Sequence, residues 1–346
     1  GATGLQGATG LKGDTGDPGV APTNVVWVAA SGGDYTLLSA ALTSIDDASA
    51  SNPYVVRIAA GVYTEPSTVL LKDYVDVEGS GQNVTTITCA CASASPGAVV
   101  SAGNITAEIR HITIDNSTGT GDYAGGVFTT GVADETFSML HITATATGGT
   151  LLSYGVFNDS SSPMMNNVTA TATGGTNHRG VVNYSSSPTM SNVTATATGG
   201  SSENWAVNNE SSSSPTMNNV TATASGGNES YGVRNSSSSP TMDNVTATAS
   251  GGTTNYGVRN IVSSATMNNV TATASGGINS YGVENNESSA TIRGSSITGT
   301  TTSIRLTNVA SAMVANTMLD GSVSGTTFTC VGAHTAAFAA LNATCT

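Results

Sequence analysis

The chain has 346 residues, and its nine basic and 22 acidic residues give a net charge of −13. Because nucleic-acid binding requires clustered Lys and Arg, this balance excludes a nucleic-acid-binding protein. No run of about 18 apolar residues occurs, so we predict no membrane span.

The first 19 residues have glycine at every third position, the Gly-X-Y register of collagen. These glycines are Gly1, Gly4, Gly7, Gly10, Gly13, Gly16 and Gly19. Only glycine fits at the axis of a collagen triple helix, so residues 1–23 are predicted to be a collagen-like tail and linker. We expect this tail to assemble with other copies, as a homotrimeric stalk or along a homopolymeric filament. A Gly-rich linker is the alternative.

An N-terminal capping helix is predicted in "GGDYTLLSAALTSIDD", residues 32–47. Its apolar residues Tyr35, Leu38, Ala41, Leu42 and Ile45 recur at helical spacing, so they share one helix face. Such a helix would cover the unpaired strand edge at the end of a stack of strands.

Four segments between residue 24 and about 120 occur in a familiar order: "SGGDYTLLSAALTSI", "YVVRIAAGVYTE", "VDVEGSGQNVTTI" and "IRHITIDNS". In this order they resemble the pectinesterase-like and pectate-lyase-like family of right-handed parallel β-helices. The resemblance implies an entry helix followed by early β-helix turns. That family's pectin chemistry uses Gln residues, an Asp pair and an Arg. This chain has only Gln6 and Gln82, and Asp243 stands alone in its later turns, so we expect no enzyme activity.

A repeat of about 25 residues fills the middle of the chain. The segment "NNVTATASGG" and its close copies place Val168, Val193, Val220, Val245 and Val270 at steps of 25, 27, 25 and 25. Each unit contains three short segments with strand-like alternation, as in "YGVRN", "SPTMDN" and "VTATA". A period of this length with strand patterning predicts an all-β fold, a parallel β-helix in which each repeat is one turn.

Two columns of identical residues should form inside this helix, because equivalent residues of successive turns lie about 4.8 Å apart. The first is a Met column: Met139, Met165, Met190, Met217, Met242 and Met267. The second is an Asn column whose stacked amides would bond from turn to turn: Asn158, Asn183, Asn209, Asn235, Asn260 and Asn285.

Threonines of the "VTATA" strands should form an outward face, because the Val and Ala between them share the inward parity. They are Thr169, Thr171, Thr194, Thr196, Thr221, Thr223, Thr246, Thr248, Thr271 and Thr273, preceded by Thr143 and Thr145. A regular Thr-x-Thr surface resembles the ice-binding face of β-solenoid antifreeze proteins. The alternative is that Thr simply has a high strand propensity and a polar outer side.

Other residues give weaker chemical signals. His111 and His141 occupy equivalent positions and are interpreted as a stacked structural pair. The acidic residues Asp159, Glu203, Glu210, Glu229, Glu284 and Glu287 are placed in loops that have no calcium-binding pattern. We therefore expect no cofactor and at most incidental Ca²⁺ binding.

The four cysteines are interpreted in two ways. Cys330 and Cys345 bracket a short helix predicted at 336–341 and are expected to form a disulfide that closes a C-terminal cap. Two unpaired buried thiols are the alternative. Cys89 and Cys91 lie two apart in a predicted strand, where they would not easily bond, and are expected to be small core residues.

The predicted organisation is a tail over 1–23 and a β-helix over 24–346, with a cap and early turns at 24–120, regular repeats at 121–300 and final turns at 301–346. The main functional hypothesis is a non-enzymatic, secreted structural protein that forms a homopolymeric filament through its tail. The alternatives are a tailspike-like or adhesin protein that binds a polysaccharide or cell surface, an ice-binding protein, and a degenerate pectin-active enzyme.

Overall fold

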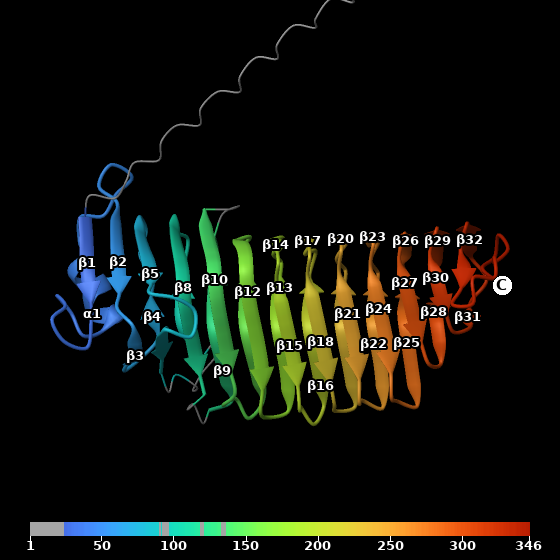
Figure 1. Ribbon diagram of the computed structural model, residues 1–346, viewed down its shortest axis with the longest axis horizontal. Coiled ribbons are helices and arrows are strands. Elements are labelled where there is room, and N and C mark those ends of the chain that lie inside the picture. The colour runs from blue at the N-terminus through green and yellow to red at the C-terminus, as the bar shows by residue number, and fades with distance from the viewer. Residues whose placement is uncertain (1–23, 90, 92–96, 118–120, 133–135) are drawn as a thin grey trace, which may run out of the picture.

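Three parallel strands per turn wind into a β-helix, as the computed structural model shows for residues 24–89, 91, 97–117, 121–132 and 136–346 (Figure 1). The predicted fold class is therefore confirmed. The glycines of the predicted collagen-like tail lie outside the described residues. Each turn has three sides, called here the first, second and third face.

The first face runs the length of the helix and carries one outward side chain at every second residue. Its strands are β1 (Asn24–Val28), β2 (Tyr54–Ile58), β5 (Val75–Gly79), the first halves of β8 (Ala107–Asn116), β10 (Phe137–Ala146) and β12 (Met164–Thr173), then β14 (Thr189–Ser191), β17 (Thr216–Asn218), β20 (Thr241–Asp243), β23 (Thr266–Asn268), β26 (Ser289–Arg293), β29 (Ser311–Ala315) and β32 (Phe328–Val331).

The second face follows a sharp bend and belongs to the same 22-stranded sheet. Its strands are β3 (Gly61–Thr64), β6 (Thr85–Thr88), the second halves of β8, β10 and β12, then β15 (Thr194–Thr198), β18 (Thr221–Ser225), β21 (Thr246–Ser250), β24 (Thr271–Ser275), β27 (Ser296–Gly299), β30 (Met318–Asp320) and β33 (His334–Thr335).

The third face is a separate 11-stranded parallel sheet. Its strands are β4 (Val69–Leu70), β7 (Ala98–Ala102), β9 (Tyr123–Thr130), β11 (Leu152–Asp159), β13 (Asn177–Tyr184), β16 (Glu203–Glu210), β19 (Glu229–Ser236), β22 (Thr254–Ile261), β25 (Asn279–Asn286), β28 (Thr302–Thr307) and β31 (Val323–Ser324).

The bend between the first and second faces uses one residue in the left-handed conformation in each turn. Asn is the commonest choice there because, among residues other than Gly, its short polar side chain tolerates positive φ best. The residues are His111, His141, Asn167, Asn192, Asn219, Asn244 and Asn269, with φ between 52° and 56°. One such residue turns the chain without breaking the strand register on either side.

The interior is filled by stacked columns. The Met column is fully buried under the first face, and each Met pairs in register with the next, as Met139 does with Met165. The Asn column lies on the inner side of the third face and is also fully buried. Each of its amides donates to the next across 2.8 Å, from Asn158 to Asn285.

Helix α1 (Leu38–Ser44) covers the N-terminal end of the stack, with Leu38, Ala41 and Leu42 buried. Its first turn has no side-chain cap of its own. Instead the buried Glu65 carboxylate accepts hydrogen bonds from the backbone N–H groups of Leu38 and Ser39, at 2.7 and 3.3 Å. Such a carboxylate satisfies the unpaired donors of a helix N-terminus and complements its dipole.

The C-terminal cap contains the expected disulfide between Cys330 and Cys345, but the helix predicted at 336–341 is wrong. The chain instead folds back on itself: Thr335 N–H donates to the Ala339 carbonyl, and His334 and Ala340 form an antiparallel bridge. Strand β33 pairs with β30 immediately before this segment, and residues 336–337 then form a turn, so the apolar spacing does not produce a helix.

Cys89 is fully buried in the core and Cys91 packs against it, as predicted, but the expectation that the two would not bond is wrong, because they form a disulfide. Strand β6 ends at Thr88, so both cysteines lie beyond it. Their Cα atoms are 5.2 Å apart, which is shorter than the roughly 6.6 Å between alternate residues of a strand.

Candidate functional site

Charged side chains gather on the outward side of the first face, at its N-terminal end. Strand β5 buries Val77 and so turns Asp76 and Glu78 outward. Strand β8 buries Ile109 and turns Glu108 and Arg110 outward in the same way. Because the strands are parallel and in register, the two pairs lie side by side.

Arg110 connects the carboxylates of this cluster. Its guanidinium lies 2.5 Å from Glu108, 3.4 Å from Glu78 and 3.5 Å from Asp76. Burial disfavours the charge of Arg110, but Glu108 and Glu78 outweigh this effect and raise its pKa above the usual value. Arg57 on β2 adds a second ion pair to Glu78, at 3.2 Å.

Asp76 and Glu108 differ in their surroundings, although they are neighbours. Asp76 accepts a hydrogen bond from the Glu108 backbone N–H at 2.8 Å, whereas the Glu108 carboxylate accepts one from the Ser138 hydroxyl at 3.1 Å. Burial raises the pKa of the Asp76 carboxyl above its usual value, against the opposing effects of the Glu108 N–H and the Arg110 charge. Burial thus raises the pKa of one of two neighbouring carboxyls, although both are paired with Arg110.

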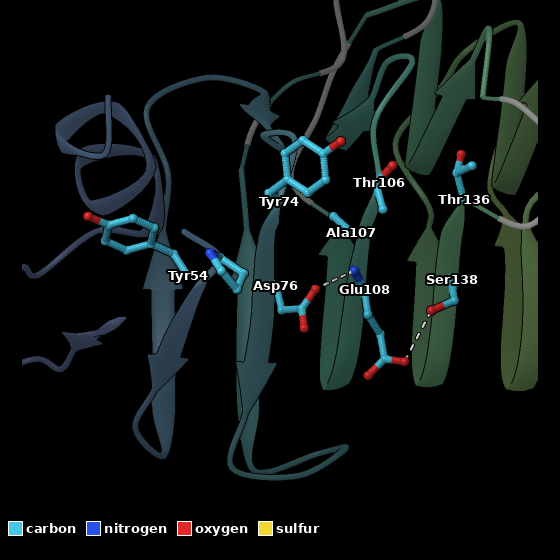
Figure 2. A pocket seen from close by; sticks show the side chains of 9 residues that line it. Tyr54, Tyr74, Asp76, Thr106, Ala107, Glu108, Thr136 and Ser138 are labelled. Carbon is cyan, nitrogen blue, oxygen red and sulfur yellow. Dashed lines mark hydrogen bonds between the residues drawn. The ribbon is translucent and has the colours of Figure 1, made fainter. Parts of the chain in front are cut away.

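An open cavity of about 300 Å³ lies over these carboxylates. Figure 2 shows Asp76, Glu108 and Ser138 in a row on neighbouring strands, with the rings of Tyr54 and Tyr74 along one side. Tyr54 is held by a hydrogen bond from its hydroxyl to Asp47 at 2.6 Å. Aromatic walls around a few polar groups are typical of sites for small organic groups such as sugar units.

The predicted site residues lie elsewhere in the helix. The Met and Asn columns are in the core, and the outward threonines are on the second face, across the bend from the face that carries the carboxylate cluster. His111 and His141 stack at the bend, with ring centroids 5.0 Å apart. In the part of the chain that the structure describes, no group of three His, Cys, Asp or Glu side chains is arranged to hold a metal ion.

Most of the acidic residues that were predicted to lie in loops belong to third-face strands instead. Glu203 and Glu210 bound β16, and Glu229 begins β19. Glu284 in β25 pairs with Arg259 at 2.8 Å. Each of these third-face strands is longer than the "YGVRN" segment that the sequence indicated, so the strand includes the flanking acidic residues.

The sequence analysis missed the carboxylate cluster. Asp76 and Glu108 are 32 residues apart, in early turns that do not follow the period of 25, so no column revealed them. The outward parity of "VDVEG" and "AEIRHI" was the available signal, since an apolar residue alternates with a charged one in both segments.

No family model matches the sequence, and no curated protein matches it. Solved structures do resemble it. The A-module of mannuronan C-5 epimerase AlgE6 from Azotobacter vinelandii is 15% identical with a TM-score of 0.54, over 86% of this chain and 95% of the other. The catalytic domain of a GH87 α-1,3-glucanase is 15% identical with a TM-score of 0.52, over 94% and 66%.

A third similar structure is the enzymatically active domain of tailspike protein 2 from bacteriophage CBA120, with 12% identity and a TM-score of 0.53. That match covers 77% of this chain and 43% of the other. The expectation that the chain is not an enzyme is overturned by these comparisons, because the similar structures are an epimerase module, a glucanase catalytic domain and an enzymatically active tailspike domain. That expectation was based only on the absence of the Gln, Asp and Arg residues that the pectin-active family uses. At these identities the likeness shows the fold: a right-handed parallel β-helix.

Proposed function

We propose that the protein binds an extended polysaccharide across the first face, over β2, β5, β8 and β10, and cleaves it at Asp76 and Glu108. The observation that carries this proposal is the pair of neighbouring carboxylates in unlike surroundings. Glycoside hydrolysis uses one carboxyl as an acid and a second as a base or nucleophile. The similar enzymes named above, which act on mannuronan and α-1,3-glucan, support a polysaccharide as the substrate class.

In the proposed reaction Asp76 serves as the acid: in its protonated form it donates its proton to the glycosidic oxygen as the bond from that oxygen to the sugar carbon breaks. Glu108 attacks the same carbon, and water then releases the sugar while Asp76 takes back a proton. The backbones of adjacent strands lie about 4.8 Å apart. This spacing favours the close carboxyl separation of roughly 5 Å that accompanies retention of the anomeric configuration. Arg110 positions both side chains.

The test is the release of reducing ends from a panel that includes alginate and α-1,3-glucan. Asp76→Asn and Glu108→Gln should each lower turnover by about 10²-fold or more, while binding to the same glycan is retained. Asp243→Asn is the matched control, because Asp243 is a lone carboxylate on the same face in β20 and its neighbours in the column are Asn218 and Asn268. Its turnover should equal that of the wild type.

Cleavage that survives Asp76→Asn would contradict the assignment of the acid. Binding of a glycan by the wild-type protein without any release of reducing ends would contradict cleavage and leave the same face as a recognition surface. The likeness to a tailspike domain supports that second role. Two disulfides further support secretion, since disulfides persist in oxidising compartments.

The collagen-like tail keeps its place in this proposal as the part that joins copies. A Gly-X-Y strand satisfies its backbone only beside other chains. Deleting residues 1–19 should leave the β-helix folded by circular dichroism and its turnover unchanged, but reduce its sedimentation to that of a single copy. A truncated protein that assembles like the full chain would contradict this role.

A further inference from the structure

Twelve outward threonines, two per turn over six consecutive turns, form a two-dimensional array on the second face. This threonine array consists of Thr143, Thr145, Thr169, Thr171, Thr194, Thr196, Thr221, Thr223, Thr246, Thr248, Thr271 and Thr273. Each threonine pairs in register with the equivalent threonine of the next turn. The spacings are about 4.8 Å between turns and about 6.6 Å along each strand.

The side chains of the array point away from the core. The alanines between them, such as Ala222 and Ala224 in β18, are fully buried, which turns Thr221 and Thr223 outward. No hydroxyl of the array forms a hydrogen bond with another side chain or a backbone group of the described residues. By contrast, serines at the buried corner of the same turns, such as Ser213, do bond backbone carbonyls. The array therefore offers its hydroxyls and methyls to the solvent.

Charge is excluded from the array and appears at both of its ends. On the N-terminal side, Thr145 is paired with Asp115 of β8. On the C-terminal side, the Thr positions continue as Ser296 and Thr298 in β27, and Asp320 of β30 follows Thr298. Between these ends, every outward position of the array is a neutral hydroxyl side chain.

Simple copying of one repeat does not account for this uniformity, because other outward positions change in the same turns. At one solvent-facing third-face position, Tyr184, Glu210 and Ser236 succeed one another. On the first face, Leu140 is followed by Asn166 in the next turn. The second face keeps threonine at two positions through all six turns, whereas the first face keeps it at one position, from Thr189 to Thr291.

We propose that the threonine array is an ice-binding surface. A rigid surface that repeats one contact in two directions matches a partner that is itself periodic in two directions, and a crystal face has this property. Methyl groups order the adjacent water, and hydroxyls anchor it by hydrogen bonds. The lack of charge agrees with this ligand, since ice offers no counter-ion. This inference does not depend on the carboxylate site.

The full chain should slow the growth of ice crystals and show thermal hysteresis, a gap between the melting and freezing points. Thr223→Lys places a charge at the centre of the array and should reduce the hysteresis to the level of a buffer blank. The matched control is Thr266→Lys, an outward threonine on the first face that is half-buried like Thr223, which should retain the wild-type hysteresis. Circular dichroism should show that both variants are folded.

Absence of hysteresis in the folded wild-type protein would overturn the proposal, and so would equal hysteresis in the wild type and Thr223→Lys. A second copy is the competing partner for a flat face. Self-association in sedimentation that Thr223→Lys abolishes, without hysteresis in the wild type, would assign the array to that contact instead. Turnover at the carboxylate site should be the same in both Lys variants, which separates the two proposals.

Discussion

Replacing one amide in the middle of the Asn column should destabilise the β-helix more than removing a partner at the end of the column. Asn209 accepts a hydrogen bond from Asn183 and donates one to Asn235, both at 2.8 Å. The column begins at Thr129, whose hydroxyl donates to Asn158 at 2.8 Å. All these side chains are fully buried, so water cannot replace a lost partner.

The expected magnitudes follow from the number of groups left without a partner. Asn209→Leu keeps a similar volume but leaves the Asn183 amide N–H and the Asn235 carbonyl oxygen unpaired. Each unpaired buried group costs about 1–3 kcal/mol, so the variant should lose about 2–6 kcal/mol of unfolding free energy. Thr129→Val leaves only the Asn158 oxygen unpaired and should lose about 1–3 kcal/mol.

Urea denaturation followed by far-ultraviolet circular dichroism would measure both losses. The slope of unfolding free energy against urea concentration must be the same for the wild type and both variants. Repeat proteins can unfold in parts, and a changed slope would mean that the free energies of different transitions are being compared. Hydrogen exchange of the backbone around residues 183–235 gives an independent local measurement. Equal losses in Asn209→Leu and Thr129→Val would refute the reasoning, since the column would then not act as a continuous chain of bonds.

Three further predictions concern stability. Glu65→Ala should lower the melting temperature by removing the acceptor at the start of α1, while Glu65→Gln should restore part of the loss; equal melting of the two variants would contradict the cap. Burial lowers the pKa of His178, so the folded state favours the neutral ring. The contribution of this ring to the unfolding free energy should be fully present above the unfolded pKa of about 6.5 and should be lost as the pH drops below that value. His178→Asn should flatten this dependence in denaturation curves at several pH values. Met217→Asp should cost several kcal/mol, whereas Thr223→Asp should cost little, and similar melting would show that the inward and outward sides are misassigned.

The sequence predicted the regular part of the fold because parity and period act together there. A residue such as Met217 recurs at the same place in every turn, and the turn length leaves only one inward side for it. The same reasoning failed at the C-terminal end of the chain, where one neighbouring strand decides the local structure. The segment 336–341 has helical spacing, but the strand β30 beside it offers backbone partners that hold β33 extended.

The candidate site was less predictable because it depends on turns that occur only once. Asp76 and Glu108 are neighbours across a turn of 32 residues, which departs from the period of 25, whereas a column is found only where residues repeat. The raised pKa of Asp76 depends on burial, which cannot be deduced from its place beside Val77. The backbone role of the left-handed bend residues could not be deduced from the sequence: His111 and His141 were interpreted only as a stacked pair, and the Asn residues, such as Asn192, stand only in Asn-x-Thr triplets.

The varied third face has a consequence for how the chain finds its register. Strands with the same "VTATA" sequence can pair with a neighbour one turn too far along, because the wrong partner presents the same Val, Ala and Thr side chains. On the third face such a slip would place Arg179 beside Tyr231 instead of Trp205, against which its guanidinium now lies at 4.2 Å from the ring centre. It would also separate Arg234 from Glu210, now 3.2 Å away. The unlike residues of this face thus identify each turn, and a chain whose other two faces are nearly uniform can still fold into one alignment.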